Sequence, residues 1–236
     1  MIKTILFDLD GTLLPMDQKK FVKAYFGSLA KRLAPYGFEP ESLSAGIWAG
    51  MAAMVKNDGK VLNEVRWWES FDAGFGGKAK KSRGELEAYY KEDFGGVRHS
   101  CGHNPQAKEV VDALKSRGLR LVLATNPVFP ATATEQRVGW AGLETSDFEL
   151  ITTYDNSHYC KPNPDYYREI LAKIGAKAEE CMMVGNDVDE DMIAETLGVK
   201  VFLLTYDVLN KHEKDISVYR KGGFDELLEY IAEVCG

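Results

Sequence analysis

The 236-residue sequence has few cysteines and no long apolar run. Its four cysteines, Cys101, Cys160, Cys181 and Cys235, include no CxxC pair, so we expect free thiols and no disulfides. No segment approaches the roughly 18 consecutive apolar residues of a membrane span. The first segment is too short and too acidic at its end for a signal peptide. We therefore expect a cytoplasmic protein that does not contact membranes.

Basic residues are also outnumbered. The chain holds 29 Lys and Arg against 36 Asp and Glu, which gives a formal net charge of -7. A chain of this charge repels phosphate backbones and anionic membranes at long range, so we expect no nucleic-acid partner. Its length allows either one large α/β domain or a core with a smaller inserted domain, and we favour the second.

Five apolar runs have the length and composition of strands, with helical patterns between the later ones. The runs are KTILFDLD (3–10), LRLVLATN (119–126), FELITTY (148–154), CMMVGND (181–187) and KVFLLT (200–205). The density of apolar residues in the first run predicts a strand that is buried on both faces. Together they predict an α/β fold with a doubly wound parallel sheet.

Residues 16–95 contain no comparable strand run. Apolar side chains instead recur at helical spacing, first at Phe21, Tyr25 and Leu29 and then at Ile47 and Met51. We predict a helical domain over 16–95, inserted into an α/β core of residues 1–15 and 96–236. Within the insertion, the glycine-rich stretch at residues 74–81 (GFGGKAKK) predicts a mobile loop.

Polar residues follow three of the predicted strands: Asp8 and Asp10, Thr125 and Asn126, and Asn186 and Asp187. Ligands of open parallel sheets bind beyond the carboxyl ends of the strands, so we expect these side chains to converge. With Asp191 they would concentrate negative charge, and Lys161 supplies only one positive charge. A cluster of hard carboxylate oxygens that can share a bound cation with phosphate oxygens is a good site for Mg²⁺. We therefore expect Mg²⁺ as the cofactor.

Four motifs, in this order, resemble those of the haloacid dehalogenase-like (HAD) hydrolase superfamily. They are FDLDGTLL (7–14), the strand that ends in Thr125, the pair Lys161-Pro162 before a helix, and VGNDVDED (184–191). The resemblance implies a Rossmann-like core and an α-helical cap that follows the first motif and acts as a lid. It also implies a phosphoglycolate-phosphatase-like enzyme that hydrolyses a small phosphorylated metabolite, with Mg²⁺ and an aspartyl-phosphate intermediate.

The resemblance also implies a role for each motif residue. Asp8 would be the nucleophile, and Asp10 would protonate the leaving oxygen and then activate water. Thr125 and Lys161 would hold phosphoryl oxygens. Backbone N–H groups near Asp10, Gly11 and Asn126 would complete the phosphate site.

The metal ligands implied by the resemblance are Asp8, the main-chain carbonyl of Asp10 and an acid of the last motif. Many relatives place an acid directly after the glycine of that motif, whereas here Gly185 is followed by Asn186 and then Asp187. We favour Asp187, which has Asp191 four residues later, and keep Asn186 as the alternative ligand.

Two other functions stay open at this point. A phosphomutase or phosphotransferase of the same superfamily would use the same nucleophile, and a non-catalytic phospholigand-binding or interaction module would keep only the fold. The full set of Asp8, Asp10, Thr125 and Lys161 favours an enzyme. In the insertion, Arg66 and Lys56 are the candidates for lid groups that reach the substrate.

Overall fold

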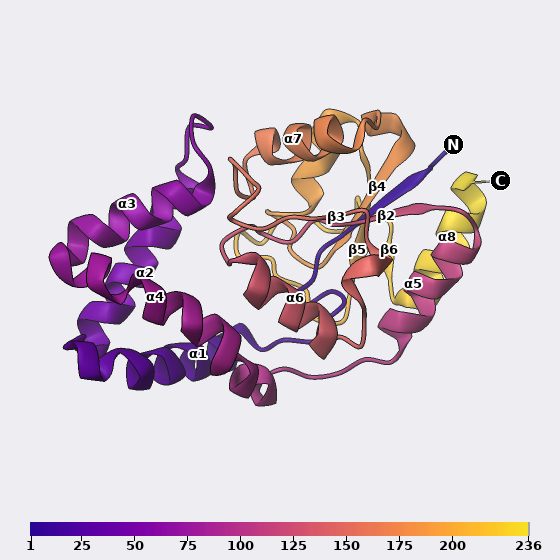
Figure 1. Ribbon diagram of the computed structural model, residues 1–236. Coiled ribbons are helices and arrows are strands. Elements are labelled where there is room, and N and C mark those ends of the chain that lie inside the picture. Colours follow the sequence, from indigo (N-terminus) through magenta and orange to yellow (C-terminus); the bar gives the residue numbers. More distant parts are fainter. Residues whose placement is uncertain (236) are drawn as a thin grey trace.

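The computed structural model describes residues 1–235, which form a six-stranded parallel sheet in the order β3-β2-β1-β4-β5-β6 (Figure 1). The strands are β1 Thr4–Phe7, β2 Arg120–Leu123, β3 Leu150–Ile151, β4 Cys181–Gly185, β5 Lys200–Leu204 and β6 Lys221–Gly222. The five predicted strands and the α/β class are confirmed. The sixth strand was not predicted because two residues are too short to show a pattern.

Helices flank the sheet and also form a separate segment beside it (Figure 1). The α-helices are α1 Gln18–Leu33, α2 Pro40–Val55, α3 Asn63–Phe75, α4 Gly77–Glu92, α5 Gln106–Ser116, α6 Ala131–Trp140, α7 Pro164–Ile174 and α8 Phe224–Cys235. Short 3-10 helices are η1 Ala34–Tyr36, η2 Phe94–Ser100, η3 Thr145–Asp147, η4 Ala178–Glu180 and η5 Met192–Leu197. Within residues 1–235, none of the helices combines the length and apolar character that a bilayer crossing requires.

Strand β1 is buried on both faces, as its composition predicts. Successive side chains of a strand point to opposite sides of the sheet. Ile5 and Phe7 therefore join the apolar cluster that includes side chains of α5 and α8, whereas Leu6 joins the cluster of α7 and η5. The two helical layers hold β1 at the centre of the molecule, and this fixes the position of the acids that follow it.

Helices α1 to α4, which we call the helical segment, leave and rejoin the sheet domain at one place. Met16 and Cys101 form an antiparallel bridge, and the Gly102 N–H donates to the Pro15 carbonyl at 2.8 Å. Helix α1 begins after Asp17, whose carboxylate accepts the N–H groups of two residues in the first turn at 3.0 and 3.1 Å. The two connections thus run side by side.

The start of α3 forms a second contact with the sheet domain. The Asn63 N–H donates to the Ser157 carbonyl at 2.8 Å, and Asn63 Nδ2 lies 3.3 Å from Cys160 Sγ. Asn63 Oδ1 accepts a hydrogen bond from Asn57 at 2.9 Å. The helical segment is therefore fixed to the loop that carries Lys161 as well as to its own connections.

The structure contradicts the mobile loop predicted at residues 74–81. Helix α3 continues to Phe75 and α4 begins at Gly77, so that Gly76 alone turns the chain, with φ 55° and ψ -133°. Ala79 and Ser82 are buried, and the Ser82 hydroxyl donates to the Lys78 carbonyl at 3.0 Å. Burial of small side chains outweighs the weak helix propensity of the glycines here.

Candidate active site

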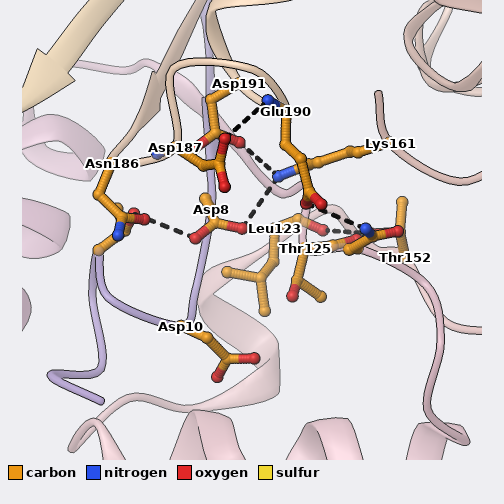
Figure 2. Close-up of polar contacts among 12 residues, drawn as sticks. Asp8, Asp10, Leu123, Thr125, Thr152, Lys161, Asn186, Asp187, Glu190 and Asp191 are labelled. Atoms are coloured by element: carbon orange, nitrogen blue, oxygen red, sulfur yellow. Dashed lines mark hydrogen bonds and ion pairs between the residues drawn. The ribbon is translucent and has the colours of Figure 1, made fainter. Parts of the chain in front are cut away.

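The predicted motif residues gather beyond the carboxyl ends of β1, β2 and β4 (Figure 2). Asp8 directly follows β1, Thr125 lies two residues beyond β2, and Asn186 directly follows β4. β1 pairs with β2 on one side and with β4 on the other, so the strand order changes direction here. A cavity of about 330 Å³ opens at this place.

Lys161 joins two of the acids. Its Nζ donates to Asp8 Oδ1 at 2.9 Å and to Asp191 Oδ1 at 2.6 Å (Figure 2). The lysine side chain is only 1% exposed, and a buried charge is costly without partners. Asn163 caps α7 just after it, since its side chain accepts the Asp165 N–H at 2.9 Å. The cap and the two carboxylates together position the ammonium group.

The charges in this group shift one another's protonation. Burial alone would lower the pKa of Lys161, but Asp191 and Asp8 raise it well above its usual value. Burial raises the pKa of Asp191 to about 7, although the adjacent Lys161 opposes this shift. The ammonium group therefore stays charged at neutral pH, whereas Asp191 titrates near neutrality.

Thr12 contacts the second oxygen of the candidate nucleophile. Its hydroxyl lies 3.1 Å from Asp8 Oδ2 and 3.1 Å from Asn186 Oδ1. Gly11 makes the turn possible, since its φ is +87° and a side chain there would overlap the Asn186 amide. The Gly11 N–H, which we predicted to face the phosphate, donates to the Leu14 carbonyl at 2.8 Å and is used within the turn.

The two alternative metal ligands have different surroundings. Asn186 uses both ends of its amide, because Nδ2 donates to the Asp207 carbonyl at 2.6 Å and Oδ1 lies beside Thr12. Asp187 Oδ1 accepts the N–H groups of Asp189 and Glu190 at 2.8 and 3.0 Å. The hydrogen bonds among residues 1–235 leave Asp187 Oδ2 unused. This supports the preference for Asp187.

The donor set fits a hard divalent cation. Five acids line the cavity, namely Asp8, Asp10, Asp187, Glu190 and Asp191. The buried cations beside them are Lys161 and Arg137. Within residues 1–235 no three His, Cys, Asp or Glu side chains converge closely enough to hold a metal by themselves. Mg²⁺ does not require this, since it is commonly bound by one or two carboxylates together with waters and substrate oxygens.

Asp10 forms an ion pair with Arg137, a residue that was not predicted from the sequence. Arg137, on α6, is 1% exposed and donates from Nη1 to Asp10 Oδ2. Its guanidinium also lies over the Phe129 ring, 4.6 Å from the centroid. Burial raises the pKa of Asp10, and Arg137 opposes this shift. In Figure 2, Asp10 lies apart from the group formed by Asp8, Lys161 and Asp191.

Two side-chain hydrogen bonds hold the backbone just beyond the end of β2. The Thr125 carbonyl accepts hydrogen bonds from the Tyr166 hydroxyl at 2.9 Å and the Thr152 hydroxyl at 2.6 Å. Asn126 Nδ2 donates to Glu190 Oε2 at 3.0 Å, whereas its Oδ1 is buried and has no partner among the described residues. Thr125 and Asn126 both line the cavity. They therefore form its wall on the β2 side.

The candidates for lid groups do not reach the cavity. Arg66 instead forms ion pairs with Asp58 at 2.9 Å and with Glu69 at 3.0 Å. Lys56 is exposed at the end of α2 and is not among the lining residues. The prediction of these two residues is wrong, because local acids engage the arginine and the lysine points to solvent.

The chain resembles known proteins over most of its length. The family model of haloacid dehalogenase-like hydrolases matches residues 2–194. The chain is 25% identical over 226 residues to glyceraldehyde 3-phosphate phosphatase of Methanothermobacter thermautotrophicus, covering 91% of this chain and 90% of that protein. It is 28% identical over 207 residues to phosphoglycolate phosphatase of Aliivibrio fischeri, covering 87% and 85%.

Solved structures share the fold. A 2-haloacid dehalogenase from Pseudomonas syringae pv. Tomato has a TM-score of 0.66 at 18% identity, and the match covers 99% of this chain and 100% of that one. A HAD phosphatase from Thermococcus onnurineus has a TM-score of 0.60 at 18% identity, with 98% of each chain covered. With the family match over residues 2–194, the chain belongs to the haloacid dehalogenase-like hydrolase family.

Proposed function

We propose that this hydrolase is a Mg²⁺-dependent phosphatase that acts on a small phosphomonoester through an aspartyl-phosphate on Asp8. One observation carries the proposal: the Asp8 carboxylate is held at the end of β1 by Lys161 and Thr12, beside a cavity rich in acids. The names of the phosphatase relatives support the same reaction class.

In this mechanism, an oxygen of Asp8 attacks phosphorus and the alcohol leaves. Asp10 donates a proton to the leaving oxygen and later accepts one from the water that hydrolyses the aspartyl-phosphate. Lys161 offsets the charge on the phosphoryl group, and Thr125 and Asn126 bind its oxygens. Asp10 would act through Oδ1, which has no hydrogen-bond partner among the described residues, while its Oδ2 keeps the contact with Arg137.

Mg²⁺, when bound, would supply the remaining positive charge for the phosphoryl oxygens. Asp8, Asp187 and the main-chain carbonyl of Asp10 would hold it, with Asp191 as a further candidate. The excess of carboxylates over cations in the cavity supports this assignment.

We further propose the division into a core of residues 1–15 and 96–236 and a cap of residues 16–95. Side chains of α1 and α2 line the same cavity as Asp8, which suits a lid that excludes bulk water during phosphoryl transfer. The cytoplasmic location stays a prediction, and the four free cysteines agree with it.

The test is phosphate release from p-nitrophenyl phosphate, with Mg²⁺ and with EDTA. We expect turnover only with Mg²⁺, and its loss in Asp8→Asn. Acid-quenched Asp10→Asn should retain one phosphoryl group on the peptide that contains Asp8, as detected by mass spectrometry, because its hydrolysis step is slowed. Turnover in Asp8→Asn would refute the mechanism, and transfer to a second sugar phosphate in place of water would indicate a mutase.

A further inference from the structure

We infer that the leaving group of the substrate is uncharged and largely apolar, an alkyl or aryl alcohol with no carboxylate or second phosphate. The inference rests on the proposed function, since it names the substrate class of the same site. It is carried by the character of the cavity wall that faces Asp8 from the helical segment.

That wall is built from apolar side chains. It contains Phe21, Val22 and Phe26 of α1 and Trp48, Met51 and Val55 of α2. Trp48 is 47% exposed and Val55 is 42% exposed, although both are large and apolar. Exposed apolar groups that gather around a cavity are typical of a ligand-binding surface. The Trp48 ring also packs edge-on against Phe26, with centroids 5.6 Å apart.

The same wall offers no positive charge to an anion. Among the described residues that line the cavity, none contributed by the helical segment is Lys or Arg, and its one polar side chain other than Tyr25 is Gln18. Of the two lining cations, Arg137 is paired with Asp10, and Lys211 is exposed on the core segment between β5 and β6. A carboxylate on the leaving group would lose hydration against this wall and gain no positively charged partner from it.

A neighbouring cavity of about 210 Å³ extends the same environment. It shares with the active-site cavity the lining residues Tyr25, Met51, Val128 and Phe129. Its other members include Trp67 and Trp68, and its acids Glu64, Glu87 and Asp155 outnumber its single cation, Lys91. A longer leaving group would therefore also meet aromatic rings and net negative charge.

The experiment compares benzyl phosphate with its para-carboxy derivative, because their leaving oxygens are chemically alike. We expect kcat/KM with Mg²⁺ to favour benzyl phosphate by at least about a hundredfold, and phosphoglycolate to be a poor substrate. Val55→Lys adds a cation to the wall. It should reduce the ratio of kcat/KM for benzyl phosphate to kcat/KM for the para-carboxy derivative by at least about tenfold. Val65→Lys is the matched control, since Val65 is 40% exposed and lies outside the cavity.

The corresponding benzylphosphonates, which cannot be hydrolysed, test recognition separately by calorimetry with Mg²⁺. Tighter binding of the phosphonate without the carboxylate, with no ester hydrolysed, would refute the proposed phosphatase and leave the inference standing. Equal or tighter binding of the carboxylated phosphonate, or equal kcat/KM for the two esters, would overturn the inference and leave the phosphatase standing.

Discussion

The Arg137 guanidinium donates a hydrogen bond to Asp10 Oδ2, and this contact joins α6 to the motif that follows β1. Each partner also has one buried atom, Arg137 Nε and Asp10 Oδ1, with no hydrogen bond among the described residues. The pair is therefore only partly satisfied. It holds Asp10 away from Lys161 and still leaves it an oxygen for another donor.

The first prediction concerns the stability that this ion pair supports. Asp10→Asn leaves the guanidinium of Arg137 buried without a counter-charge, so we expect the free energy of unfolding to fall by about 3 kcal/mol. Urea denaturation measures the change. The matched control is Asp58→Asn, which removes an exposed partner of Arg66 and should alter stability little. Equal losses in the two variants would contradict a buried pair.

The second prediction concerns Gly185, at the end of β4. A methyl group at this position would overlap the Asp191 carboxylate, whose Oδ1 accepts a hydrogen bond from Lys161. We expect Gly185→Ala to lower kcat/KM by about a hundredfold or more while the protein stays folded, because misplaced catalytic groups are costly. Gly27→Ala, in the middle of α1 with nothing nearby, should leave the rate unchanged. Full activity in Gly185→Ala would show that catalysis does not depend on the position of the Asp191 carboxylate.

The third prediction separates the two candidate ligands. Mg²⁺ at 100 times its Kd should add about 2.7 kcal/mol to the free energy of unfolding, since it binds only the folded chain. Asp187→Asn should weaken this stabilisation, whereas Asn186→Ala should retain it. Thermal denaturation across a Mg²⁺ titration, with EDTA as the blank, measures both. The reverse pattern would place Asn186 on the metal.

The fourth prediction concerns the pH dependence of the metal-free protein. The pKa of Asp191 is about 7 in the folded chain, against an ordinary value of 3.8. The folded state therefore binds more protons than the unfolded state between these values, and the contribution of Asp191 to stability falls as pH rises from about 4 to about 7. Asp191→Asn should remove this fall. Denaturant unfolding over that pH range measures how the free energy of unfolding changes with pH. The same change in the wild-type protein and in Asp191→Asn would contradict the raised pKa of Asp191.

Local patterns in the sequence predicted most of the core. Long apolar strands and the acids that follow them are read from neighbouring residues, and this was enough to bring Asp8 and Asp187 to one edge of the sheet. The place of Lys161 beside them was predicted from the resemblance to the family motifs. Arg137 escaped because its partner is 127 positions away and an arginine on a helix usually faces solvent. Arg66 was misassigned for a related reason, since its ion pairs with Asp58 and Glu69 depend on side-chain geometry.

Lys161 and Asp8 are 153 positions apart in the chain, and the whole helical segment and β2 and β3 lie between them. No nascent or partly refolded chain that lacks the region after β3 can bring the two groups together. Such long-range pairing forms late and slowly compared with local helices. Recovery of catalysis during refolding should therefore lag behind recovery of the helical circular dichroism signal. Activity would then report that the long-range contacts of the fold have formed.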